Sequence, residues 1–86
     1  MKLKVQVTQK YIDEGSRNDQ WWCPVARALR GTLPIERISV NYEAISIAGH
    51  GFDVTFPTSR TVKKFINAFD AYGPAKVKPF SFSIRT

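Results

Sequence analysis

The sequence has only one cysteine and one histidine among its 86 residues. One cysteine cannot form a disulfide within the chain, and one cysteine with one histidine cannot complete a structural zinc site. No apolar run approaches the roughly 20 residues that a membrane-spanning helix needs. The first ten residues alternate polar and apolar side chains, unlike a signal peptide. A free thiol without an export signal predicts a cytoplasmic protein.

Acidic residues are also few, with seven Asp and Glu against 13 Lys and Arg and a formal net charge of +6. The bases concentrate towards the two ends. Residues 1–10 carry three bases and no acid (+3), residues 11–53 four bases and six acids (−2), and residues 54–86 six bases and one acid (+5). This distribution favours an acidic partner, such as nucleic acid or an acidic protein surface. The alternative is a solvated basic surface that only keeps a small protein soluble.

The hydrophobic content of 43% and the charged content of 23% are typical of a folded protein, and the length suits one domain over residues 1–86. Alternating apolar side chains predict strands over residues 2–7, 36–57 and 80–85, the middle one broken near residues 41–44 and by the turn Ala48–Gly51. A short helix is expected over residues 9–14. A second helix should begin at Pro24 and end just before Gly31.

The clearest helix follows Thr58 or Ser59 and stops at Gly73. The predicted order is therefore β-α-β-β-α-β, an α+β fold in which two helices pack on one face of a mostly antiparallel sheet of four or five strands. A ferredoxin-like arrangement is the leading expectation. The residues expected in one core are Val5, Val7, Phe65, Ile66, Phe69, Phe80, Phe82 and Ile84. Because the aromatic strand residues share the parity of the core, we expect no exposed aromatic platform for RNA bases.

The sequence offers little for catalysis. Cys23 precedes Pro24 at the start of a helix, so it is either a reactive thiol with His50 as its base or, as we favour, a structural residue that fixes the helix start. Asp13 and Glu14 are adjacent and do not form an acid–base pair. We therefore expect no enzymatic activity, no cofactor and no bound metal.

The adjacent tryptophans Trp21 and Trp22 are more informative. Neighbouring residues in a loop before a helix seldom both point inward, so one is expected to anchor the helix and the other to be an interaction hot spot. The alternative is that both pack under the loop as core residues.

Four segments resemble a group of short, uncharacterised bacteriophage and prophage proteins. The group has a lysine-rich first strand, a Cys-Pro-[Val/Ile]-Ala helix start, a Phe-Ile-x-x-Phe-Asp helix and a Lys-Pro-Phe-x-Phe end. These elements match Lys2–Val7, Cys23–Arg30, Phe65–Asp70 and Lys78–Phe82. The resemblance implies a non-enzymatic protein that binds host machinery in the host cytoplasm.

Two functions from different classes follow. The first is a protein-binding module that modulates an acidic host protein, for example as an inhibitor of a defence or nucleic-acid-processing enzyme. Its expected contact residues are Trp21, Trp22, Arg60, Lys63, Lys64, Lys76 and Lys78. The second is a nucleic-acid-binding protein that contacts phosphates through Lys2, Lys4, Lys63, Lys64, Lys76, Lys78 and Arg85. Neither involves a membrane.

We expect Arg60, Lys63 and Lys64 to oppose the dipole of their helix, a local disadvantage that favours a role in binding.

Overall fold

The computed structural model describes residues 2–33, 35, 37–49 and 51–85 and has an α+β fold, as predicted. The elements are β1 (Lys2–Val7), α1 (Gln9–Glu14), α2 (Pro24–Thr32), β2 (Arg37–Val40), β3 (Ala44–Gly49), β4 (Phe52–Pro57), α3 (Arg60–Tyr72), the 3-10 helix η1 (Pro74–Lys76) and β5 (Phe80–Arg85). Among the described residues, no helix is long and apolar enough to span a membrane.

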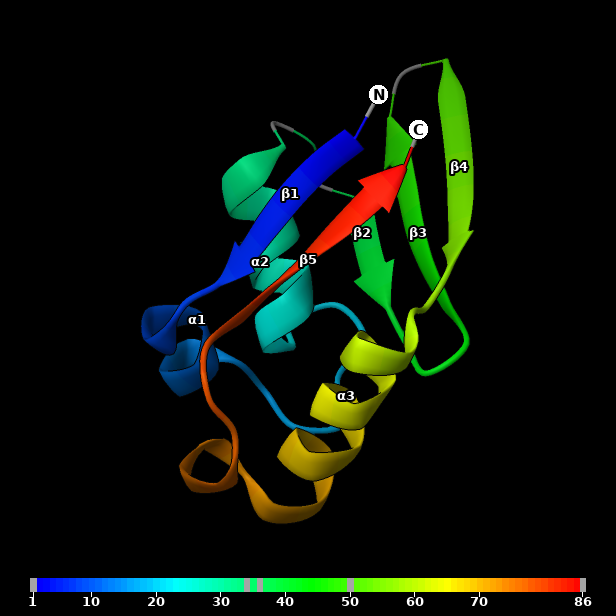
Figure 1. Cartoon of the computed structure of the whole chain (residues 1–86). Helices are drawn as coiled ribbons and strands as arrows, with labels where there is room; N and C mark the ends of the chain where they lie inside the picture. The colour runs from blue at the N-terminus through cyan, green and yellow to red at the C-terminus, as the bar shows by residue number, and fades with distance from the viewer. Residues whose placement is uncertain (1, 34, 36, 50, 86) are drawn as a thin grey trace.

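The strands form two antiparallel sheets, one of β1 and β5 and one in the order β2-β3-β4 (Figure 1). The predicted single sheet and its ferredoxin-like order are therefore not confirmed, since the described part of the chain has the order β-α-α-β-β-β-α-β. Helix α2 packs against both β1 and β2. The two sheets thus both contact this helix, and among the described strands β1 pairs only with β5.

The core lies between the sheets and the helices, as the strand parity predicts. Val5, Val7, Phe65, Phe69 and Ile84 are buried. The remaining predicted core residues are half-buried and pack against this cluster, namely Ile66, Phe80 and Phe82. In the register of the first sheet, Val5 lies opposite Phe82 and Val7 opposite Phe80, so no aromatic platform faces solvent there. Val54 on β4 departs from the pattern and is 43% exposed.

Four aromatic rings connect α3 to the sheet of β1 and β5. Phe69 stacks on Phe65 with ring centroids 5.9 Å apart, and Phe65 lies 4.7 Å from Phe80. Phe80 in turn stacks on Phe82 at 6.0 Å. Offset and tilted aromatic pairs of this kind add to the stabilisation from burial. The row therefore fixes the position of α3.

Helix α2 starts as predicted and ends later than predicted. Pro24 occupies its first turn, and the Cys23 Sγ accepts a hydrogen bond from the Ala26 N–H (3.5 Å). The helix continues through Gly31 to Thr32, and the Leu33 N–H donates to the Leu29 carbonyl. The Tyr11 hydroxyl lies where a Cβ on residue 31 would be. Gly31 is thus needed for a close approach between α1 and α2 and not to end the helix.

Helix α3 begins and ends where the sequence predicts. Ser59 caps its start by accepting a hydrogen bond from the Val62 N–H (3.4 Å), and Gly73 follows its end with a φ of 85°. The Arg17 guanidinium donates to the carbonyls of Asp70 (2.8 and 3.1 Å) and Ala71 (2.9 Å). A cation at the carbonyl end of a helix is favourable, so Arg17 ties the loop before α2 to α3.

The predicted break near residues 41–44 is the turn between β2 and β3. The Asn41 Oδ1 accepts hydrogen bonds from the N–H groups of Glu43 and Ala44, both at 2.8 Å. The predicted turn after β3 joins two antiparallel strands, β3 and β4. His50, in that turn, lies outside the described residues.

Candidate functional site

Both tryptophans before α2 are about half exposed, Trp21 at 47% and Trp22 at 49%. The expectation that one of them anchors the helix in the core is therefore wrong, and so is the alternative that both are core residues. The buried face of α2 is made by smaller side chains, among them Val25, Ala28 and Leu29. Both tryptophans therefore lie outside the buried face of α2.

The loop that carries the tryptophans, residues 15–23, is held by hydrogen bonds and is called the Trp loop below. The Asp19 Oδ1 accepts from the N–H groups of Trp21 (2.9 Å) and Trp22 (3.2 Å). The Val40 N–H donates to the Gln20 carbonyl at 2.7 Å, which connects the loop to β2. The Asn18 N–H donates to the Asp70 Oδ1 at 2.9 Å, which connects it to α3. The exposed indoles therefore stand on a fixed backbone.

Two arginines of α2 lie over the Trp22 ring. The Arg30 Cζ is 4.5 Å from the ring centroid and the Arg27 Cζ is 5.4 Å from it, both within the range of a cation–π interaction. This cluster is not among the sites predicted from the sequence. Two features of the sequence could have predicted it. Arg27 and Arg30 are three residues apart, which places them on one face of a helix, and Trp22 lies just before that helix.

Arg30 has a structural role at this surface. Its Nη1 donates to the Trp21 carbonyl and its Nη2 to the Ile38 carbonyl (2.8 Å), so it joins the Trp loop to β2. Burial lowers the pKa of Arg30, and the neighbouring Arg27 lowers it further. The guanidinium therefore bears a desolvation cost that its two carbonyl partners offset.

The basic residues of α3 form a separate group. Arg60 and Lys64 are exposed, and the Lys63 Nζ lies 5.1 Å from the centroid of the Tyr42 ring in the β2–β3 turn. Arg60 is the first residue of α3, Lys63 closes its first turn and Lys64 begins the second. The effect of the helix dipole falls off within the first turn, so it is strongest at Arg60 and weakest at Lys64. The expectation that these bases oppose the dipole stays a prediction.

Lys76 and Lys78 lie beyond the other end of α3. The helix has 13 residues and is about 20 Å long at the usual rise per residue. Arg60 starts it, whereas η1 and the segment to β5 follow its end (Figure 1). The structure therefore does not bring Arg60 into one patch with Lys76 and Lys78. For the nucleic-acid alternative, Lys4 is exposed on β1, and the side chains of Lys2 and Arg85 lie outside the described part.

Cys23 is 6% exposed and serves as the N-cap of α2. Burial raises the pKa of its thiol, and the nearby carboxylates of Asp70 and Asp19 also raise it. Hydrogen bonds from two backbone N–H groups act in the opposite direction and do not overcome burial. These surroundings disfavour the thiolate that a nucleophile requires.

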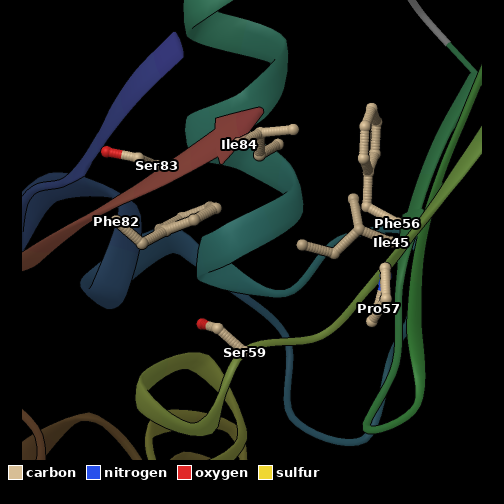
Figure 2. A pocket seen from close by; sticks show the side chains of 7 residues that line it. All are labelled: Ile45, Phe56, Pro57, Ser59, Phe82, Ser83 and Ile84. Carbon is tan, nitrogen blue, oxygen red and sulfur yellow. The ribbon is translucent and has the colours of Figure 1, made fainter. Parts of the chain in front are cut away.

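An apolar cleft of about 190 Å³ separates β5 from the β3–β4 hairpin (Figure 2). Phe82 and Ile84 line it from β5, while Ile45 and Phe56 line it from the hairpin. Its volume is below the 300–1,000 Å³ that is usual for small-molecule sites, and none of the described residues that line it is charged. Ser59 and Ser83 contribute the polar groups of its lining, and Ser59 already caps α3.

A second, more polar hollow of about 280 Å³ adjoins the Trp loop. It lies where this loop, the β2–β3 turn and α3 meet, and its lining includes Asp19, Asp70, Asn67 and Tyr42, with Cys23 also contributing. One oxygen of each carboxylate already accepts hydrogen bonds from the loop backbone. This side of the Trp loop is therefore acidic, whereas the side that carries Arg27 and Arg30 is basic.

Within the described ranges, no group of three or more His, Cys, Asp or Glu side chains is placed to hold a metal ion. Comparison with known protein families, curated proteins and solved structures gives no match to this chain. The resemblance to phage proteins therefore stays a prediction.

Proposed function

We propose that this protein is a non-enzymatic binding module that docks on an acidic surface of another protein through Trp21 and Trp22. The observation that carries the proposal is the exposure of both indoles, close to one half each, on a loop whose backbone is hydrogen-bonded to β2 and α3. Tryptophan is enriched among interface hot spots. A loop that is already ordered also loses little conformational entropy when a partner binds.

Charge supports the same conclusion. The net charge of +6 favours encounter with an acidic partner. Arg60, Lys63 and Lys64 on α3 lie outside the Trp loop, and we assign them a steering role that raises the rate of encounter. In line with the resemblance to phage proteins, we place the partner among the proteins of a bacterial host. The proposed target is a defence or nucleic-acid-processing enzyme in the host cytoplasm, which the protein would inhibit.

The test is capture of a partner by the immobilised full-length protein from bacterial lysate, with and without nuclease treatment. Trp21→Ala should abolish a saturable capture that survives nuclease. Tyr72→Ala is the matched control, because Tyr72 is an aromatic residue that is 70% exposed at the end of α3, and it should leave capture unchanged. Capture that needs nucleic acid, or that is equal for the Trp21→Ala variant and the wild type, would contradict the proposal.

A further inference from the structure

The two arginines that stack on Trp22 differ in what their remaining donors do. Arg30 uses two of its nitrogen atoms on the carbonyls of Trp21 and Ile38 and is part of the fold. Arg27 donates only through its Nε, to the Trp22 carbonyl at 3.2 Å. Within the part of the chain that the structure describes, neither Nη group of Arg27 has a hydrogen-bond partner.

Arg27 is nevertheless held in place. Its Nε is bound to the Trp loop, and its guanidinium lies over the Trp22 ring. It is also half-buried, so its charge is less screened than that of a freely solvated side chain. A fixed guanidinium with two open donor groups matches the geometry of a carboxylate or phosphate, which it can bind with two parallel hydrogen bonds.

We infer that Arg27 is the anion-recognition residue of this surface and that it binds a carboxylate of the partner, beside an apolar side chain that packs on Trp21. The inference rests on the proposed function and specifies the partner as a protein segment with an Asp or Glu next to an apolar residue. Trp21, Trp22 and Arg27 together are called the Trp face below.

The surroundings favour an isolated carboxylate over a nucleic-acid strand. Binding of single-stranded nucleic acid needs a basic groove that follows several successive phosphates. The other side of the Trp loop, however, is a hollow lined by Asp19 and Asp70, and a continuous chain of phosphates that passes over the loop would be repelled there. A protein segment can place one acidic residue on Arg27 and uncharged residues over the hollow.

The experiment is a titration of the purified full-length protein, followed by the NMR signals of the two indole N–H groups. Polyglutamate serves as the carboxylate probe, and an oligothymidylate of equal charge serves as the phosphate probe. Polyglutamate should shift the Trp22 signal most. Arg27→Gln should weaken this binding about tenfold or more, because it removes a charge-assisted bidentate pair. Arg27→Lys keeps the charge but not the planar fork, so its affinity should be intermediate.

Arg37→Gln is the matched control, because Arg37 is exposed on β2 and lies outside the Trp face. It removes one positive charge and should change polyglutamate binding by less than about twofold. Equal losses for Arg27→Gln and Arg37→Gln would reduce the effect to net charge and overturn the inference. Tighter binding of oligothymidylate at the same indole signals would also overturn it, in favour of nucleic acid. The partner capture described above separates the two proposals. If Trp21→Ala abolishes capture and Arg27→Gln does not, the proposed function stands and the role of Arg27 is refuted.

Discussion

Replacing Phe69 with alanine tests whether the row of four rings holds α3 in place. Phe69 is 1% exposed and lies nearly parallel to Phe65, with an angle of 9° between the rings. Removing a buried phenylalanine side chain costs about 3–5 kcal/mol, and the lost ring pair contributes about 0.5–1.5 kcal/mol beyond burial. An 86-residue domain has a free energy of unfolding of about 4–13 kcal/mol. Phe69→Ala therefore removes about a quarter of the stability or more.

The free energy of unfolding is measured by urea denaturation followed by far-UV circular dichroism. Phe69→Leu keeps an apolar side chain of intermediate size, so it should stay folded and lose less stability than Phe69→Ala. Tyr72→Ala is the matched control on the same helix, and because Tyr72 is 70% exposed it should change the stability by no more than about 0.5 kcal/mol. A loss for Phe69→Ala as small as that for Tyr72→Ala would refute the assignment of α3 to the core.

Three further predictions concern the Trp loop and the charges. Gly15→Ala should destabilise the fold by about 1–3 kcal/mol in urea denaturation, because a Cβ there would lie 2.5–2.7 Å from atoms of Pro24; an unchanged midpoint would show that the loop can shift. Cys23 should react slowly with iodoacetamide at neutral pH while the protein is folded. The pKa of this thiol is raised in the folded protein above its ordinary value of about 9. As the pH rises above 9 the unfolded state loses the thiol proton first, so the free energy of unfolding falls. Cys23→Ser should remove this loss of stability at alkaline pH and retain a cap on the helix. If the melting temperatures of the variant and the wild type fall equally at alkaline pH, the raised pKa is contradicted. Replacing Lys63 and Lys64 with Glu should weaken partner binding most at low salt. The melting temperature should change little, because the lost cation–π contact is worth about 0.5–1 kcal/mol. Unchanged affinity at low salt would show that α3 takes no part in binding.

The sequence by itself determined which segments are helices and strands, because these depend on local patterns. The apolar spacing of α3, its Ser59 cap and the terminating Gly73 are all within one stretch of chain. The alternation in β1 and β5 likewise identified which side chains face the core. Cys23 next to Pro24 indicated the start of α2, and the structural role that we favoured for this cysteine agrees with its buried cap position. In each case neighbours along the chain supply the deciding interactions.

Only the tertiary structure decided how these segments combine. Strand alternation does not specify a partner strand, so the split into two sheets, both of which α2 contacts, is visible only in the structure. The sequence predicted that Gly31 ends a helix, whereas in the structure the Tyr11 hydroxyl of α1 lies against it. The exposure of both tryptophans and the hydrogen bonds of Arg27 and Arg30 likewise depend on where the Trp loop lies against β2 and α3. These features arise from competition for space and hydrogen-bond partners among residues distant in sequence, which local periodicity does not encode.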